Sequence, residues 1–314
     1  MHAAVLRYFD HVARQGSIRK AAEALSVASS AVNRQILRLE DEIGVPLFER
    51  SRSGVRPTPA GEILLRHVRE TQNEFQRARA EIASLSGTVS GTVRIVSLES
   101  VVARVLPQIV ADMAARHPRL NFTVLTVHPS EFSDALGSGD SDFAVLFIDN
   151  RVSGVEIVAE FQTTVGALMR PDHPLAGAKK LTLTECARHP VVMLNDRWLL
   201  DPIMAAEFAQ SGARLTPRIV SNSIEFMRQT ISRGLGIGFV SPIGFLDEIR
   251  RGELVHVPLA EPGLASSRIG ILVPRQRRLS PPARLAINHV QKHLDEFGRL
   301  LTRPVRASKR GRRA

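Results

Sequence analysis

The chain has 314 residues, a length that favours two domains and a connector over a single domain. Its 44% apolar and 23% charged residues are ordinary for a globular protein, and its single cysteine, Cys186, excludes an intramolecular disulfide. The first seventeen residues carry charges within an amphipathic pattern, which is typical neither of a signal peptide nor of a membrane span. We therefore expect a cytoplasmic protein with no membrane partner.

The net charge of +11 is concentrated at the C-terminus. Residues 268–314 hold 13 basic and two acidic residues, whereas residues 1–90 hold 13 basic and 10 acidic residues. The overall charge is therefore weak evidence for DNA binding. Residues 303–314 contain six basic residues and no acid, so we expect a disordered basic tail there.

Three helices are predicted at the N-terminus. Apolar spacing predicts the first over residues 3–15, with Gly16 as its C-cap, and a second, short helix capped by Ser17. After a turn at residues 26–28, Ser29 or Ser30 is expected to cap the third helix, which Gly44 ends. One stripe of this third helix is expected to face the core, formed by Val32, Ile36, Leu39 and Ile43.

The opposite face of the third helix and the basic segment after Gly44 are candidates for DNA contact. Polar side chains near the start of such a helix reach base edges, and a two-stranded wing with basic flanks reaches phosphates. The candidate DNA-binding residues are Ser29, Ser30, Asn33, Arg34, Arg38, Arg50, Arg52 and Arg56. Two alternatives stay open, because Arg38 could lie on a solvated face and Arg50 could pair with Glu49 or Glu42.

Residues 9–61 contain a set of short elements whose order and spacing are typical of one family. The elements are Gly16-Ser17, Ala21-Ala22-Glu23-Ala24-Leu25, Ala31-Val32, Arg34-Gln35-Ile36, Leu39-Glu40, Gly44, Leu47-Phe48-Glu49-Arg50 and Thr58-Pro59-Ala60-Gly61. In these elements the chain resembles the LysR-type transcriptional regulators. The resemblance implies that residues 1–58 form a winged helix-turn-helix that binds a double-stranded DNA operator and regulates transcription. Ser29 and Asn33 depart from the family's frequent Gln and Ser, so the operator sequence cannot be copied from relatives.

A long linker helix is predicted over residues 59–87. Thr58 and Pro59 form a typical helix start, and apolar residues then recur with a period of 3.5. The candidate dimerisation residues are Leu64, Val68, Phe75, Ile82 and Leu85. This seam favours a homodimer, or a homotetramer of two dimers. The alternative is that the stripe packs on the chain's own domain, but about 28 residues span about 42 Å and would extend past a small winged domain.

Residues 88–302 predict an α/β domain of two lobes. In the first lobe, strands are expected at residues 93–96, 122–127 and 143–147, with helices at residues 106–115 and 131–136. A connection over residues 150–162 leads to the second lobe. There, strands are expected at residues 191–194, 218–220 and 237–240, with helices at residues 203–210 and 224–232. We expect parallel sheets in both lobes and a cleft between them.

The resemblance implies that this domain is similar to periplasmic binding proteins and binds a small-molecule effector of unknown identity. Ligands of open α/β sheets bind beyond the carboxyl ends of strands. The candidate effector-binding residues are Ser97, Ser100, Thr126, Asn195, Trp198 and Ser221. Serine and threonine also cap helices, and Trp198 could be a core residue. Glu99 is unexpected there, because its carboxylate would repel an anionic effector; it should point away, or the effector should carry an amine.

The alternative function is an α/β-domain enzyme with an accessory DNA-binding module. Gly234 to Gly238 have the wrong spacing for a dinucleotide loop and precede a strand instead of following one. The sequence shows no nucleophile with its base and acid, and His289 and His293 lack a third metal ligand. We therefore predict no enzymatic activity, no cofactor and no metal site.

Overall fold

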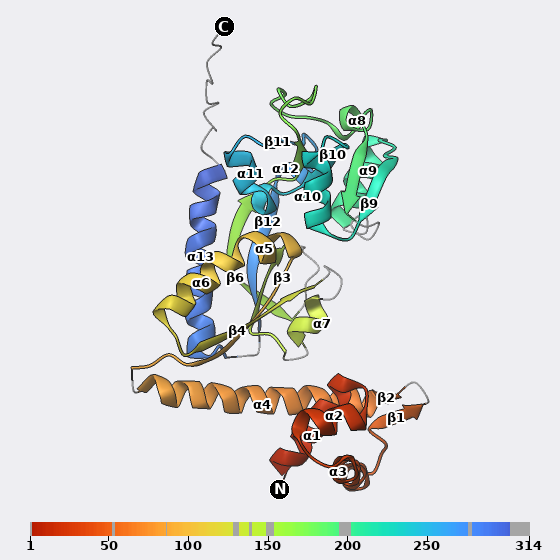
Figure 1. The fold of residues 1–314 in the computed structure, drawn as a ribbon, viewed down its shortest axis with the longest axis vertical. Helices are drawn as coiled ribbons and strands as arrows, with labels where there is room; N and C mark the ends of the chain where they lie inside the picture. The colour runs from red at the N-terminus through yellow and green to blue at the C-terminus, as the bar shows by residue number, and fades with distance from the viewer. Residues whose placement is uncertain are drawn as a thin grey trace. The chain divides into compact units, whose positions relative to one another are not determined.

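The computed structural model describes residues 2–51, 54–85, 87–127, 132–137, 140–148, 154–194, 202–275 and 278–301. The chain divides into two compact units, built mainly on residues 1–88 and on residues 89–136 with 141–314 (Figure 1). The predicted tail over residues 303–314 lies outside the described residues, as do Arg52, Asn195 and Trp198.

The first unit begins with α1 (His2–Gln15), α2 (Ile18–Leu25) and α3 (Ser29–Ile43). Ser17 caps α2 as predicted, its Oγ accepting a hydrogen bond from Lys20 N. The expected cap of α3 is wrong: Ala28 is the N-cap, without a side-chain hydrogen bond, so Ser29 begins the helix itself. The three helices share one apolar core, which includes Phe9, Val12, Ala21, Ala22, Val32, Ile36 and Leu39.

A two-stranded wing follows α3 and leads into the long helix α4. Strands β1 (Phe48–Ser51) and β2 (Gly54–Pro57) pair antiparallel, and α4 spans Pro59–Leu85. Thr58 caps α4 as predicted, because its Oγ1 accepts a hydrogen bond from Gly61 N at 3.0 Å. A Cβ on Gly61 would lie 2.1 Å from the carbonyl oxygen of Leu47. Only glycine therefore lets α4 approach the base of the wing this closely.

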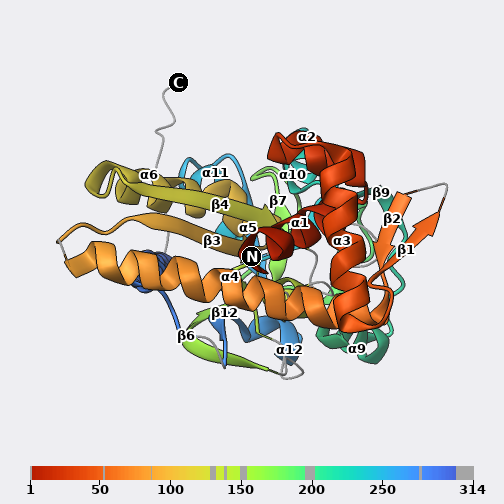
Figure 2. The same ribbon diagram turned by 90° about the horizontal axis from the view of Figure 1, so that it is seen from below.

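The two halves of α4 have different surroundings. Leu65 and Val68 in its first half are buried in the core of the first unit. The C-terminal half extends away from α1, α2 and α3 (Figures 1 and 2). Phe75, Ile82 and Leu85 in that half are 64%, 66% and 86% exposed, so an apolar face of α4 is left uncovered.

The second unit contains two five-stranded sheets, and the sheet of lobe I has the order β4-β3-β5-β12-β6. Strands β3 (Gly91–Ser97), β4 (Leu120–Thr126) and β5 (Phe143–Phe147) pair in parallel. Strand β12 (Ser267–Pro274) runs antiparallel between β5 and β6 (Val155–Thr163). Helices α6 (Leu106–Arg116) and α13 (Pro281–Leu301) cover one face, and α7 (Phe132–Gly137) packs on the other.

The sheet of lobe II has the order β11-β7-β10-β8-β9. Strands β8 (Val191–Leu194), β9 (Pro217–Ser221) and β10 (Ile237–Val240) are parallel, whereas β7 (Gly166–Met169) pairs antiparallel with β10 and β11 (Val255–Pro258). Helices α8 (Leu183–Cys186), α9 (Pro202–Ser211) and α12 (Pro262–Ala265) cover one face. Helix α10 (Ile224–Ser232) covers the other.

Two expectations about these lobes are wrong. Residues 155–163 form strand β6 instead of part of a connection, and both sheets are mixed instead of parallel. The reason lies in the chain path, because β12 returns from lobe II to complete the sheet of lobe I between β5 and β6. The chain therefore crosses between the lobes twice, near residues 164–165 and near residue 266.

Candidate functional site

Helix α3 presents the first candidate site. Val32, Ile36 and Leu39 are buried, which turns the opposite face of α3 to the surface. Ser29, Ser30, Arg34 and Arg38 lie exposed on it, as the sequence predicted. The predicted fourth member of the buried stripe is wrong, because Ile43 is 48% exposed at the end of the helix. The exposed face offers hydroxyl and guanidinium groups, which are donors suited to base edges and phosphates.

The wing is fastened to α3 by one carboxylate. Glu40 Oε1 accepts hydrogen bonds from the backbone amides of Leu47 and Phe48, at 2.8 and 3.0 Å. Arg50 donates from Nη1 to Asn33 Oδ1 at 3.0 Å, and its Nη2 lies 3.7 Å from Glu40 Oε2. The partners of Arg50 are thus Asn33 and Glu40, where the sequence suggested Glu49 or Glu42. Asn33 is half-buried, and Arg56 lies exposed on β2.

The predicted dimerisation residues divide into two groups. Val68 is 2% exposed within the core of the first unit, and Leu64 packs against the same core. These two side chains therefore stabilise their own domain, and the assignment of Val68 to an exposed seam is wrong. Phe75, Ile82 and Leu85 are exposed in the C-terminal half of α4.

Of the predicted effector-binding residues, Ser97 is not accessible. Its side chain is fully buried, and its Oγ donates to the carbonyl oxygen of Val145 at 2.7 Å. The hydroxyl is satisfied inside the sheet, where it joins β3 to β5. Its prediction as an effector contact is therefore wrong, because the last residue of β3 points into the core and not past the strand end.

Ser100, Thr126 and Ser221 lie at the carboxyl ends of strands or just after them. Thr126 is exposed at the end of β4, and Ser221 is half-buried at the end of β9, where its Oγ accepts a hydrogen bond from Ser223 N at 3.2 Å. Ser100 lies in α5 (Glu99–Arg104) beside the short 3-10 helix η2 (Pro242–Gly244). A Cβ on Gly244 would lie 2.9 Å from the Cβ of Ser100. For all three residues, contact with an effector stays a prediction.

The sequence did not predict where Glu99 points. Its Oε1 accepts a hydrogen bond at 3.0 Å from the backbone amide of Ile224, the first residue of α10. The carboxylate of lobe I thus contacts a helix start in lobe II, 125 residues further along the chain. Of the two interpretations that the sequence left open for Glu99, neither anticipated a partner inside the protein.

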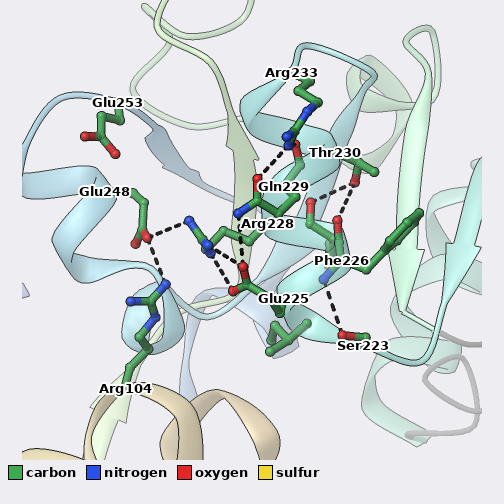
Figure 3. Close-up of polar contacts among 12 residues, drawn as sticks. Arg104, Ser223, Glu225, Phe226, Arg228, Gln229, Thr230, Arg233, Glu248 and Glu253 are labelled. Atoms are coloured by element: carbon green, nitrogen blue, oxygen red, sulfur yellow. Dashed lines mark hydrogen bonds and ion pairs between the residues drawn. The ribbon is translucent and has the colours of Figure 1, made fainter.

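A second group of charged residues also joins α5 to lobe II (Figure 3). Glu248 in α11 (Leu246–Arg250) is 1% exposed, and its Oε1 accepts from Arg104 Nη2 at 2.9 Å and from Arg228 Nη1 at 3.1 Å. Arg104 ends α5, and Arg228 lies on α10. Because a buried carboxylate is costly without partners, the two guanidinium groups fix the place of Glu248 between the lobes.

Arg228 also binds the carboxylate in the first turn of α10. It donates to Glu225 through Nε and Nη2, and Gln229 donates to the same carboxylate. These hydrogen bonds lower the pKa of Glu225 to about 2, so this carboxylate stays ionised even at mildly acidic pH. The first turn of α10 is therefore already bordered by two carboxylates of the protein, Glu225 and Glu99.

Together, a winged helix-turn-helix and a two-lobed α/β domain define a DNA-binding transcription regulator with a ligand-binding domain. The family models agree: residues 4–62 match the bacterial regulatory helix-turn-helix protein, lysR family, and residues 86–295 match the LysR substrate binding domain. The chain belongs to the LysR family of transcription regulators.

Curated relatives are named as regulators and not as enzymes. The RuBisCO operon transcriptional regulator of Allochromatium vinosum is 29% identical over 90% of this chain and 94% of its own length. YybE of Bacillus subtilis, an uncharacterised HTH-type transcriptional regulator, is 27% identical over 93% of this chain and 98% of its own. These names favour a regulator over the alternative of an enzyme with an accessory DNA-binding module.

A solved structure of the same architecture supports the fold. Full-length OxyR from Pseudomonas aeruginosa, carrying a cysteine-to-aspartate substitution, superposes with a TM-score of 0.70 at 20% identity, covering 94% of each chain. The likeness extends over both domains and the helix between them. Within the described residues, no helix is long and apolar enough to cross a membrane.

Proposed function

We propose that this regulator binds an inverted-repeat operator as a homodimer, with α3 of each protomer in the major groove. The observation that carries the proposal is the exposed face of α3, where Arg34 and Arg38 lie opposite the buried stripe and Arg50 fastens the wing beside them. Two such helices in one dimer read half-sites about one helical turn apart, roughly 10 base pairs centre to centre.

The exposed face of α4 supports pairing through this helix. Phe75 and Ile82 are seven residues apart on it, and Leu85 continues the seam. A second copy of α4 would cover these side chains, since its own seam is equally apolar. A tetramer would then arise from two such dimers through other surfaces. We also infer a cytoplasmic location, because a protein that reads operators works where the chromosome is.

The second domain is proposed to bind a small-molecule effector between its lobes. Thr126 and Ser221 at strand ends and Ser100 on α5 are the described candidates for contact. Binding would change the angle between the lobes at the two crossings near residues 164–165 and 266, and so change how the dimer holds its operator. Asn195 and Trp198, also candidates, lie outside the described residues.

The DNA proposal is tested by selecting genomic fragments with the full-length protein. We expect enrichment of one inverted repeat, protected from cleavage over both half-sites. The selection is repeated with Arg34→Ala and with Arg79→Ala, a variant of equal charge whose position is exposed on α4, away from α3. Loss of enrichment in Arg34→Ala alone supports the assignment of α3. Enrichment that is equal in all three proteins would overturn it.

The effector proposal is tested on the full-length protein by thermal shift with a library of small metabolites. A ligand that binds only the folded state raises the melting temperature in proportion to its occupancy. The hit is then tested on Ser221→Ala and Thr126→Val, with Thr71→Val on α4 as the matched control. A shift that survives in both variants of the second domain would place the ligand elsewhere.

A further inference from the structure

The contact between Glu99 and Ile224 joins two helix starts across the lobes. Glu99 is the first residue of α5 in lobe I, and Ile224 is the first residue of α10 in lobe II. The distance between Glu99 Oε1 and Ile224 N is 3.0 Å, that of an ordinary hydrogen bond. Because the acceptor is a carboxylate, the bond is charge-assisted and stronger than a bond between neutral groups.

The first amides of α10 are satisfied from both lobes. Helix starts leave backbone N–H groups without a partner in the helix, and these groups attract anions. In α10, Ser223 Oγ accepts from Phe226 N at 3.3 Å, and Glu99 accepts from Ile224 N. Ser223 is an ordinary N-cap, since it directly precedes the helix. The carboxylate takes the place that an anionic ligand would otherwise occupy.

The other end of α5 is held on lobe II independently. Arg104, the last residue of α5, donates to the buried Glu248, which also accepts from Arg228 on α10 (Figure 3). Ser100, directly after Glu99, packs against Gly244 so closely that a Cβ on this glycine would lie 2.9 Å from the serine Cβ. The first two residues and the last residue of this six-residue helix therefore contact residues of lobe II, and Glu99 is held where it can reach α10.

We propose that Glu99 is a built-in carboxylate ligand of α10 that latches lobe I to lobe II. This inference rests on the proposed effector site between the lobes, and it narrows the class of effector that this site accepts. With the Ile224 amide already bound to an anion of the protein, an effector's carboxylate does not bind at this amide. The recognised effector is neutral or cationic at this position, and a free carboxylate binds there only when Glu99 is removed.

The latch is tested by hydrogen–deuterium exchange of the Ile224 amide in the full-length protein, without any effector. In Glu99→Ala we expect this amide to exchange about tenfold to a hundredfold faster, the range set by losing a charge-assisted hydrogen bond. Glu225→Ala is the matched control, because it removes a carboxylate from the same helix turn but leaves Glu99 on Ile224. Exchange at Ile224 that is equal in wild type and Glu99→Ala would overturn the latch.

Acetate then probes the vacated amide, at constant ionic strength with chloride as the reference anion. We expect acetate to slow the exchange of Ile224 in Glu99→Ala and to leave wild type unchanged. No protection of Glu99→Ala, or equal protection of both proteins, would overturn the inference that Glu99 holds an anion position. Glu99→Gln is the second variant, since it keeps the shape of the side chain; its Ile224 exchange is expected to be faster than wild type, and equality would overturn the need for charge.

The two proposals fail separately. If no metabolite in the library stabilises the protein, the effector proposal is contradicted, but the exchange results for the Ile224 amide still stand. Unprotected Ile224 in wild type would contradict the latch and leave any metabolite hit in place. A third outcome would contradict the latch alone. In it, a metabolite needs its own carboxylate for binding, and it loses its binding when Ile224 is changed but keeps it in Glu99→Ala.

Discussion

Arg50 in β1 donates from Nη1 to Asn33 Oδ1 in α3 over 3.0 Å, and this bond ties the wing to the helix proposed to read DNA. Glu40 strengthens this link, because its carboxylate accepts hydrogen bonds from the backbone amides of Leu47 and Phe48. The side-chain oxygen of Asn33 therefore already accepts a hydrogen bond within the protein. The NH2 group of Asn33 is the part of this side chain that is left to donate to DNA. We therefore expect base recognition to depend most on Arg34, the exposed neighbour of Asn33 on the same turn.

Arg34→Ala is expected to weaken binding to the selected operator by about 1–3 kcal/mol and to leave random duplex DNA nearly unaffected, because base contacts carry specificity. Fluorescence anisotropy titrations on both duplexes measure the difference. Arg79→Ala serves as the charge-matched control. An equal loss on operator and random DNA would make Arg34 a phosphate contact.

Phe75→Asp is expected to dissociate the dimer, because pairing through α4 would bury a charge without a partner. Light scattering should then give a mass near that of one 34.5 kDa chain. Gln76→Asp adds the same charge at an exposed position outside the 3.5-residue seam and should leave the mass of the dimer unchanged. A dimer that persists in Phe75→Asp would show that another surface holds the protomers together.

Asp10→Ala is expected to destabilise the N-terminal unit by about 1–3 kcal/mol. The Asp10 carboxylate is 6% exposed and pairs with Arg14 Nε at 2.8 Å and with Arg69 Nε at 3.0 Å, so it joins α1 to α4. Its loss leaves Arg69, itself only 15% exposed, with Asp140 as its other carboxylate partner at 3.0 Å, but removes the link to α1. Urea unfolding followed by circular dichroism measures the change. Asp41→Ala, at an exposed position of α3, should change the free energy of unfolding by less than about 0.5 kcal/mol.

Stability is expected to fall with pH below about 6.5 through His256. Burial lowers the pKa of His256 from 6.5 to about 4, because the imidazolium is disfavoured where the ring packs against Gly166. The hydrogen bond between Nε2 and the Val240 carbonyl oxygen acts in the opposite direction and offsets only part of this shift. A folded pKa below the unfolded one means that the unfolded chain takes up the proton first. The stability present above pH 6.5 is therefore lost as pH falls towards 4, by up to about 3 kcal/mol.

Unfolding midpoints of wild type and His256→Asn between pH 4.5 and 7.5 test this dependence. The variant should be less stable at pH 7.5, because the ring no longer fills its site. Its stability should also decrease less steeply as the pH falls. Parallel curves for the two proteins would assign the acid sensitivity to other groups.

Cys186 is expected to react slowly with thiol reagents in the folded protein. Its side chain is fully buried in α8, and burial raises the pKa of the thiol to about 12, so the reactive thiolate is scarce at neutral pH. Titration with a chromogenic disulfide should modify one thiol per chain in urea and almost none within minutes in buffer. Rapid modification of the native protein would show that α8 opens readily.

The local sequence was sufficient to predict those helices and strands in which apolar residues recur at regular spacing. The stripe of Val32, Ile36 and Leu39 predicted the orientation of α3, and Thr58 with Pro59 predicted the start of α4. Strands β5, β8 and β10 lie at the predicted residues. Periodicity indicates such elements because burial of one face depends only on neighbours three to four residues apart in a helix, or two in a strand.

Features set by long-range contacts could not be predicted in this way. The sequence predicts a connection where strand β6 lies, because the partner strand β12 follows more than 100 residues later and nothing local marks their pairing. Val68 fits the 3.5-residue seam as well as Phe75 does, yet only Val68 is covered by its own domain. Periodicity predicts that a side chain will be covered by apolar neighbours, but it does not tell to which element those neighbours belong.

The same distinction holds for the candidate sites. The family resemblance, the exposed face of α3 and the position of Glu99 after the first strand of lobe I can all be read from the residues alone. That Ser97 turns inward to Val145, and that Glu99 reaches Ile224 in the other lobe, depends on how the strands and lobes pack. A hydrogen bond depends on distance and direction between atoms, and residues 125 positions apart acquire these only when both lobes have folded.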